Sequence, residues 1–150
     1  MTKQPPSLEQ LILRLDFEKA ILLAEQMDLE QFQIQLVNFA TKEDSNILWY
    51  PFLLEYMLYN ESAKLHNTAF HILSLPLCHL DNAALASLYH ARKALALSNG
   101  NDVEHLVPFL LLNKSPEELV SNEEAKQIAL KILKINPEHK YAIDFLENSD

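Results

Sequence analysis

The chain has 150 residues, of which 49% are hydrophobic and 22% are charged, and its formal net charge is −9. These values are typical of a folded chain of single-domain size, so they argue against disorder and against a need for disulfides or a metal in folding. An acidic chain without clustered Lys and Arg is a poor ligand for nucleic acids or anionic membranes, whereas long-range electrostatics favours a basic protein partner. Acidity that serves only solubility is the alternative.

The chain contains a single glycine, Gly100, and a single cysteine, Cys78. Glycine scarcity argues against β-rich folds and phosphate-binding loops, because both need residues with positive φ or close backbone approach. One cysteine permits no internal disulfide, which is consistent with a reducing compartment. No signal segment opens the chain, and no apolar run reaches the roughly 18 residues of a spanning helix. We therefore expect a cytoplasmic protein without a membrane span.

Short polar motifs mark helix ends along the chain. Ser7 with Gln10 three residues later has the spacing of a capping box, and Ser121 with Glu124 repeats it. Asn99-Gly100 is typical of a helix C-terminus, where a residue with positive φ ends the helix. These motifs predict helices that begin near residues 8 and 122 and one that ends near residue 98.

Three further motifs predict helix starts. Asn101 precedes Glu104 by three residues, and Ser115-Pro116 and Asn136-Pro137 would each place proline at a first helical position. Apolar residues recur at helical spacing between these motifs. The pattern predicts about eight helices and a last short one, near 8–14, 16–27, 29–41, 46–59, 61–75, 80–98, 102–113, 122–135 and 138–147.

The C-terminal half carries a weak internal repeat. Residues 94–99 (ALALSN) and 132–137 (ILKINP) each close a helix before a polar turn, with an offset of 38 residues. Offsets of this size occur in solenoids of helical hairpins. Each hairpin of such an array buries its apolar face only against its neighbours.

Residues 123–142 (EEAKQIALKILKINPEHKYA) resemble the second helix of a tetratricopeptide (TPR) repeat and its exit. Ala125 stands at the family's small residue and Pro137 at its helix-ending proline, and residues 87–106 match more loosely. The tryptophan–glycine signature of first helices is absent, and the offset is longer than the family's period. The resemblance implies an all-α fold, an antiparallel stack of helix pairs in one domain over 1–150. Its N-terminal half, about 7–60, would be irregular and its C-terminal half, about 61–148, TPR-like.

Residues 62–94, with their SAKLH, LCHL and LYHARKA segments, resemble short acidic bacterial toxin-immunity proteins. This resemblance implies a non-catalytic protein that neutralises a cognate basic toxin by direct binding. The TPR resemblance implies an alternative, an adaptor that recognises a peptide or helix in a concave groove.

Histidine and cysteine gather between residues 66 and 90, as His66, His71, Cys78, His79 and His90. Metal-binding helices place ligands three or four residues apart, whereas the first two histidines are five apart and the adjacent Cys-His pair diverges. We expect no metal and no cofactor here, but histidines at the core edge and a buried thiol.

No sequence motif of an enzyme is present. The acidic pairs Glu117-Glu118 and Glu123-Glu124 are expected in the first turns of helices, where negative charge suits the helix dipole. Adjacent Cys78 and His79 would not face each other on a helix, and no oxyanion loop is evident. We therefore expect a protein that is not an enzyme and has no catalytic residue.

The aromatic stretch 47–59 (ILWYPFLLEYMLY) is the densest apolar segment, and Pro51 suits the first turn of its helix. A helix that is apolar all round is usually central and buried. The alternative is that Trp and Tyr side chains reach a partner, because these residues are the usual anchors of protein interfaces. Charged side chains on an acidic chain would steer such a partner. The candidate partner-binding residues are Trp49, Tyr50, Tyr56, Tyr59, Glu55, His90, Asp102 and Glu104.

Overall fold

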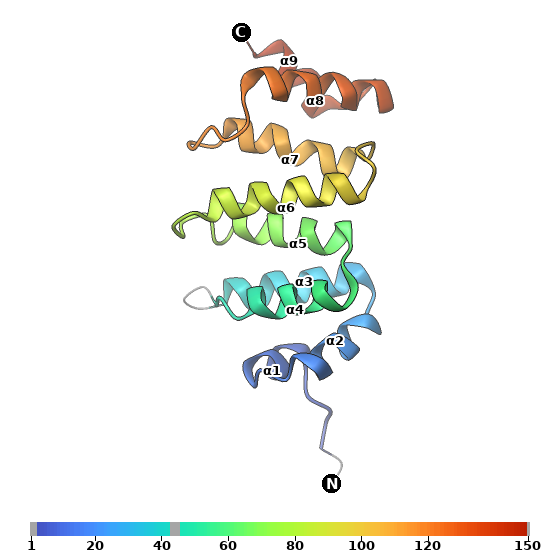
Figure 1. The fold of residues 1–150 in the computed structure, drawn as a ribbon, viewed down its shortest axis with the longest axis vertical. Coiled ribbons are helices and arrows are strands. Elements are labelled where there is room, and N and C mark those ends of the chain that lie inside the picture. The colour runs from blue at the N-terminus through green and yellow to red at the C-terminus, as the bar shows by residue number, and fades with distance from the viewer. Residues whose placement is uncertain (1–2, 43–45, 150) are drawn as a thin grey trace. The chain divides into compact units, whose positions relative to one another are not determined.

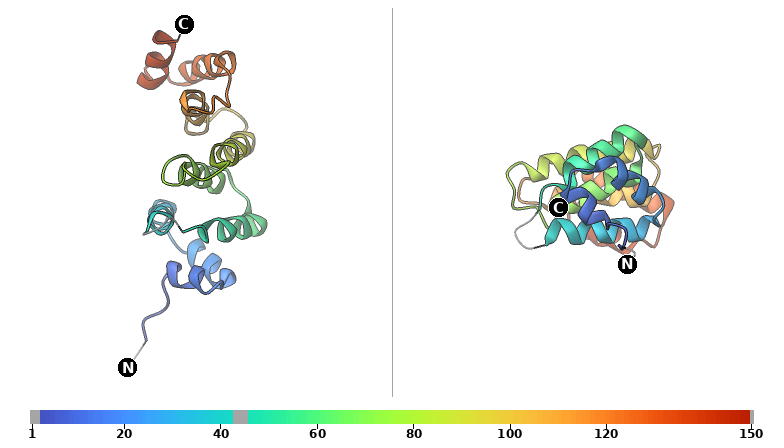
Figure 2. Two further views of the ribbon diagram at one scale, coloured as in Figure 1. Left: turned by 90° about the vertical axis from the view of Figure 1, so that its left-hand side faces the viewer. Right: turned by 90° about the horizontal axis from the view of Figure 1, so that it is seen from below.

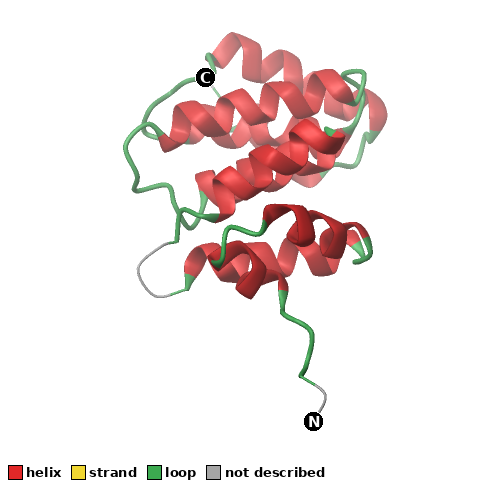
Figure 3. Ribbon diagram, turned by 60° about the horizontal axis from the view of Figure 1, so that its bottom comes forward, coloured by secondary structure: helices red, strands yellow, loops and turns green. Residues whose placement is uncertain are grey.

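The structure is a computed structural model that describes residues 3–42 and 46–149. Over these ranges it contains helices, turns and no strand, so the predicted all-α class is confirmed (Figures 1 and 3). The expected helices are present there, with ends that differ by at most about three residues from the predicted ones. They are α1 (Leu8–Leu13), α2 (Phe17–Glu25), α3 (Leu29–Thr41), α4 (Trp49–Asn60), α5 (Ala63–Ser74), α6 (Ala83–Leu97), α7 (Val103–Lys114), α8 (Asn122–Ile135) and α9 (Lys140–Glu147).

The chain divides into two compact units. The N-terminal unit comprises Met1–Glu61 and Leu75–Leu77, and the C-terminal unit comprises Ser62–Ser74 and Cys78–Asp150. In the N-terminal unit, α1 packs on α2 and α3, and α4 packs on the same two helices. In the C-terminal unit, α5 lies beside α6, and contacts follow chain order from α6 to α9 (Figure 2).

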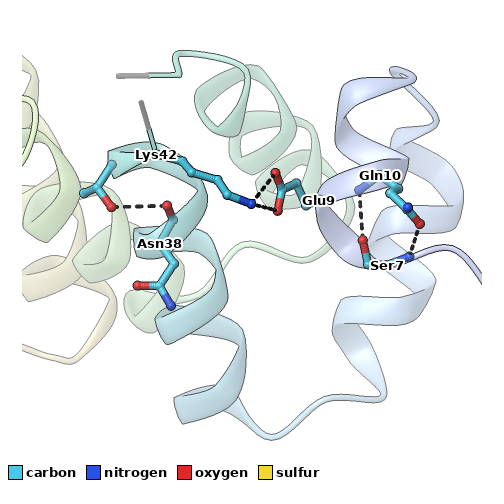
Figure 4. A network of polar contacts seen from close by, with 6 residues as sticks. Ser7, Glu9, Gln10, Asn38 and Lys42 are labelled. Carbon is cyan, nitrogen blue, oxygen red and sulfur yellow. Dashed lines mark hydrogen bonds and ion pairs between the residues drawn. The ribbon is translucent and has the colours of Figure 1, made fainter. Parts of the chain in front are cut away.

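The capping box at the start of α1 is confirmed. Ser7 Oγ accepts a hydrogen bond of 3.2 Å from the Gln10 amide, and Gln10 Oε1 accepts one of 3.0 Å from the Ser7 amide (Figure 4). Lys42, at the end of α3, places its Nζ 3.2 Å from both carboxylate oxygens of Glu9 on α1 (Figure 4). This exposed ion pair contributes at most about 1 kcal/mol. It links the end of α3 to the first turn of α1.

The helix stop at residues 99–100 is also confirmed. Asn99 and Gly100 have φ of 62° and 74°, and the Gly100 amide donates a 2.9 Å hydrogen bond to the Leu95 carbonyl. Positive φ removes both residues from the helix and turns the chain toward α7. Pro51 lies in the first turn of α4, as predicted, and the buried Pro108 lies inside α7.

The predicted helix start at Ser115-Pro116 is wrong. Ser115 is the C-cap of α7, and the chain then turns, with Glu118 at a φ of 47°. The buried Asn113 amide donates 2.9 Å hydrogen bonds to the Val120 carbonyl and to Asn122 Oδ1. These tertiary bonds hold the segment as a loop, so the pair Glu117-Glu118 does not lie in a first helical turn.

Two other helix starts lie close to, but not at, the predicted residues. Asp102 rather than Asn101 caps α7, and its Oδ1 accepts a 3.0 Å hydrogen bond from the Glu104 amide. Asn136 is the C-cap of α8, and His139 caps α9. Asp102 is the N-cap because it has the extended backbone of that position and its side chain accepts a hydrogen bond from the amide two residues later.

Each unit has its own apolar core. The largest fully buried side chains of the N-terminal unit are Ile12, Leu36, Trp49, Phe52, Leu53 and Leu77. The C-terminal unit buries a cluster along α5 to α9 that includes Phe70, Leu106, Phe109, Leu110, Ala129, Ile132 and Phe145. None of the helices in the described part of the chain combines the length and the apolar character needed to cross a membrane.

Candidate functional site

The aromatic helix α4 has a buried face and an exposed face. Trp49, Phe52 and Leu53 are fully buried, and Met57 is nearly so. The residues that alternate with them at helical spacing face solvent. We call this exposed stripe the α4 surface; it consists of Pro51, Leu54, Glu55, Leu58 and Tyr59.

Two members of the α4 surface are unusually open for apolar residues. Leu58 is 85% exposed and Tyr59 is 64% exposed, and Leu54 adds a third exposed apolar side chain one turn earlier. Scattered exposed apolar residues are normal, but a contiguous apolar stripe on one helix marks an interaction site. The α4 surface is therefore the candidate binding site of the N-terminal unit.

Ring packing beneath α4 decides which aromatic residues reach that surface. The Phe52 ring lies 5.8 Å from Phe17 of α2 and 6.4 Å from Phe32 of α3, measured between centroids. Tyr56, half-buried, packs on Phe32 at 5.8 Å. This side of the helix is core, and only the opposite side remains available to a partner.

The sequence-based choice of Trp49 as a partner contact needs correction. Its side chain is fully buried, and its indole ring packs 5.0 Å from the ring of half-buried Tyr50. The spacing that places it on the same helical side as Phe52 also turns it away from solvent. Of the other predicted aromatic residues, Tyr59 is exposed, and Tyr50 and Tyr56 are half-buried.

An acidic edge borders the α4 surface. Burial raises the pKa of the Tyr56 hydroxyl, and the Glu25 carboxylate and the Tyr59 hydroxyl raise it further. Glu25 and Tyr59 are thus each within electrostatic reach of Tyr56, where α2 packs on α4. With Glu55 on the helix itself, the apolar stripe carries acidic groups at its rim.

The N-terminal unit is the more acidic of the two. It holds ten acidic and four basic residues, against eleven and eight in the C-terminal unit. Two of its four bases are neutralised within the unit, since Lys19 pairs with Asp16 at 3.1 Å and Lys42 pairs with Glu9. Hydrogen bonding to Lys19 lowers the pKa of Asp16. Within the described ranges, the exposed acids of this unit that form no ion pair are Glu18, Glu25, Asp28, Glu30 and Glu55.

His90 is the second predicted contact that needs correction, because its side chain is fully buried. Its Nδ1 lies 2.9 Å from Nδ1 of His66, so α6 and α5 share a hydrogen bond in their interface. Burial lowers the pKa of His90 to about 4, and the neighbouring His66 adds to the effect. His90 is therefore neutral at pH 7 and is not part of an exposed basic cluster.

Two further side chains complete the description of the segment around His90. Arg92 is engaged by Glu124 of α8, with its two terminal nitrogens 2.9 and 3.3 Å from the carboxylate oxygens. Cys78, expected to be buried, is exposed, because it lies in the turn between α5 and α6 rather than on a helix. In the part of the chain that the structure describes, the five residues from His66 to His90 do not supply three converging metal ligands.

The structure brings together the predicted residues Asp102 and Glu104 and adds His105, which sequence reasoning missed. His105 Nε2 lies 4.0 Å from Asp102 Oδ2, and Asn67 of α5 donates a 3.3 Å hydrogen bond to Glu104 Oε1. The Asp-x-Glu-His spacing across one first turn could have indicated this convergence. Apart from buried His90 on α6, the predicted site residues thus belong to two groups, the α4 helix and the start of α7.

No protein-family model, curated protein or solved structure matches this chain.

Proposed function

We propose that the chain is a non-catalytic protein-binding module that uses the α4 surface to hold a basic folded protein. The observation that carries this proposal is the exposed apolar stripe on α4, with Leu58 85% and Tyr59 64% exposed. Protein interfaces combine such an apolar, aromatic centre with a polar rim. The acidic rim at Glu25 and Glu55 fits a partner that presents Lys or Arg around an apolar patch.

Within this class, an immunity-type protein that neutralises a cognate basic toxin is the reading we favour. Inhibition by a single small protein requires fast and tight association, and the net charge of the N-terminal unit would steer a basic partner to it. Toxin and inhibitor would meet in the cytoplasm, where the exposed thiol of Cys78 stays reduced. A peptide-binding adaptor is the rival, and it differs because a short peptide would suffice as its ligand.

The decisive experiment measures binding of the full chain to the protein encoded beside its own gene. We expect a dissociation constant in the nanomolar range, typical of specific protein complexes, that weakens steeply with added salt. Truncation of a buried aromatic anchor commonly costs about 2 kcal/mol or more, so Tyr59→Ala should weaken binding roughly 30-fold, and Leu58→Arg at least as much.

Leu85→Arg is the matched control, because Leu85 is an exposed leucine on α6 of the other unit, 53% accessible. It should leave the affinity unchanged. If Leu58→Arg and Leu85→Arg behave alike, the α4 surface is not the binding site. If the neighbouring protein does not bind, or binds without losing its activity, the immunity proposal is wrong. A short peptide of that protein that binds as tightly as the whole would favour the adaptor.

A further inference from the structure

We propose that Asp102, Glu104 and His105, at the start of α7, form a binding site for one divalent transition-metal ion. One ligand atom from each residue lies within 4.8 Å of the other two. The expectation of no metal was based on the histidines between residues 66 and 90. The three residues proposed here come from a different segment and meet within a single helical turn.

The buried imidazole of His105 distinguishes this group from an ordinary acidic cluster. Its side chain is only 3% exposed, yet its Nε2 is directed to the Asp102 carboxylate at 4.0 Å, beyond hydrogen-bond range. Its Nδ1 is buried and has no hydrogen-bond partner among the described residues. A buried polar atom without a partner is destabilising, and an apolar residue at this place would avoid that loss. The ring atom that would bind the ion is Nε2, because it is the one that faces the Asp102 carboxylate.

Each carboxylate is oriented through one oxygen and keeps the other available. Asp102 Oδ1 accepts the hydrogen bond of the Glu104 amide, which leaves Oδ2 facing His105. Glu104 Oε1 accepts from Asn67, which leaves Oε2 free for an ion. Outer contacts of this kind hold metal ligands in position. Both acidic residues are exposed, so an ion can enter from solvent.

The ligand types define the class of ion. Two carboxylates and an imidazole suit Zn²⁺ or Mn²⁺, whereas Ca²⁺ prefers oxygen ligands alone. The two negative charges match a divalent ion and offset the partial positive charge of the α7 N-terminus.

Capping alone does not account for this arrangement. The cap uses only Asp102 Oδ1, and it requires neither Glu104 Oε2 nor a buried imidazole. In the first turn of α8, Glu123 and Glu124 follow the cap Ser121 without any histidine, so the chain itself offers a capped acidic turn of the ordinary kind. The convergence at α7 is therefore more than a helix start.

The test titrates the full chain with Zn²⁺ by calorimetry and with Mn²⁺ by amide NMR, where the paramagnetic ion broadens nearby signals. We expect one Zn²⁺ per chain, and Mn²⁺ broadening that starts at residues 102–105. The double variant Asp102→Asn, Glu104→Gln keeps the cap and the Asn67 bond but removes both charges. It should weaken binding at least tenfold, and His105→Gln should do the same.

The matched control is Glu117→Gln with Glu118→Gln, which removes two exposed charges from a turn of the same unit without an imidazole. It should change the affinity less than twofold. Equal broadening at residues 117–118 and 102–105, or equal affinities for the two double variants, would show only nonspecific attraction to carboxylates and would overturn the proposal. Because Asp102 and Glu104 are exposed, their variants remain informative even if His105→Gln loses stability. The outcome is independent of partner binding at the α4 surface, which these variants leave intact.

Discussion

At the scale of single residues, the pair His66–His90 is the most unusual feature of the C-terminal unit. Both side chains are buried, and the Nδ1–Nδ1 distance of 2.9 Å requires one nitrogen to donate and the other to accept. A proton on the accepting nitrogen removes that hydrogen bond, and burial disfavours the charge. The pair therefore stabilises the contact of α5 with α6 only while the accepting nitrogen is unprotonated.

This pair makes stability depend on pH. The folded pKa of His90, about 4, is below the ordinary 6.5, so the unfolded chain binds the extra proton first as the pH falls. The contribution of His90 is complete above pH 6.5 and is lost toward pH 4, which amounts to about 3 kcal/mol. Urea unfolding at a series of pH values should show this decrease. His90→Gln should flatten the slope, whereas exposed His79→Gln should retain it; equal slopes would contradict the role of His90.

At the scale of elements, α4 separates stability from binding on its two faces. Leu53 is fully buried and Leu58 is 85% exposed, although both are leucines of one helix. Leu53→Ala should lower the free energy of unfolding by about 2–5 kcal/mol, because it leaves a cavity. Leu58→Ala should change it by less than about 0.5 kcal/mol. Urea denaturation of the two variants measures both effects, and a large loss for Leu58→Ala would show that its side chain is buried in solution.

The cap of α8 offers a second test at this scale. Ser121 Oγ accepts a 3.1 Å hydrogen bond from the Glu124 amide, so Ser121→Ala should cost about 1 kcal/mol. Ser121→Asp should keep most of the stability, because Asp accepts the same bond and suits the helix dipole. Thermal unfolding compares the two. If both variants melt alike, the cap does not contribute to stability.

At the scale of the whole molecule, titratable groups are distributed unevenly between the two units. All six histidines belong to the C-terminal unit, whereas the N-terminal unit holds the greater excess of acids. The contribution of buried His90 is lost as the pH falls from 6.5 to about 4, but a carboxylate such as Asp16, whose pKa is lowered below 3.8, loses its contribution only in stronger acid. The two units should therefore respond to acid in different pH ranges.

Hydrogen exchange measured by mass spectrometry at pH 6.5 and 4.5, corrected for intrinsic rates, tests this difference. From pH 6.5 to 4.5, the protection of backbone amides should decrease along α5 and α6 and stay nearly constant along α1 to α3. The fluorescence of Trp49, the single and fully buried tryptophan, should change little over this range, because it reports the core of the N-terminal unit. Parallel loss of protection in both units would contradict separate responses.

Sequence by itself determined the helices of this protein and several of their ends. Helical spacing of apolar residues and local caps such as Ser7–Gln10 and Ser121–Glu124 act within one turn, so they are readable without tertiary contacts. The start predicted at Ser115 is wrong because side-chain bonds to residues seven and nine positions along the chain oppose the local proline pattern. The start predicted at Asn136 is displaced to His139, since Asn136 ends α8 and its side chain accepts a hydrogen bond from the Glu138 amide. The side chain of Asn113 holds the first of these segments as a loop.

Tertiary structure decided which side of each helix is available. A helix that is apolar all round, such as α4, has no sequence pattern that identifies its exposed face. Phe52 packs on Phe17 and Phe32, and this packing buries Trp49 and leaves Tyr59 exposed. The same holds for His66 and His90, which are 24 residues apart in the chain and meet only when α5 packs on α6. Helix formation is a local property of the chain, whereas burial is a property of the neighbours that the fold supplies.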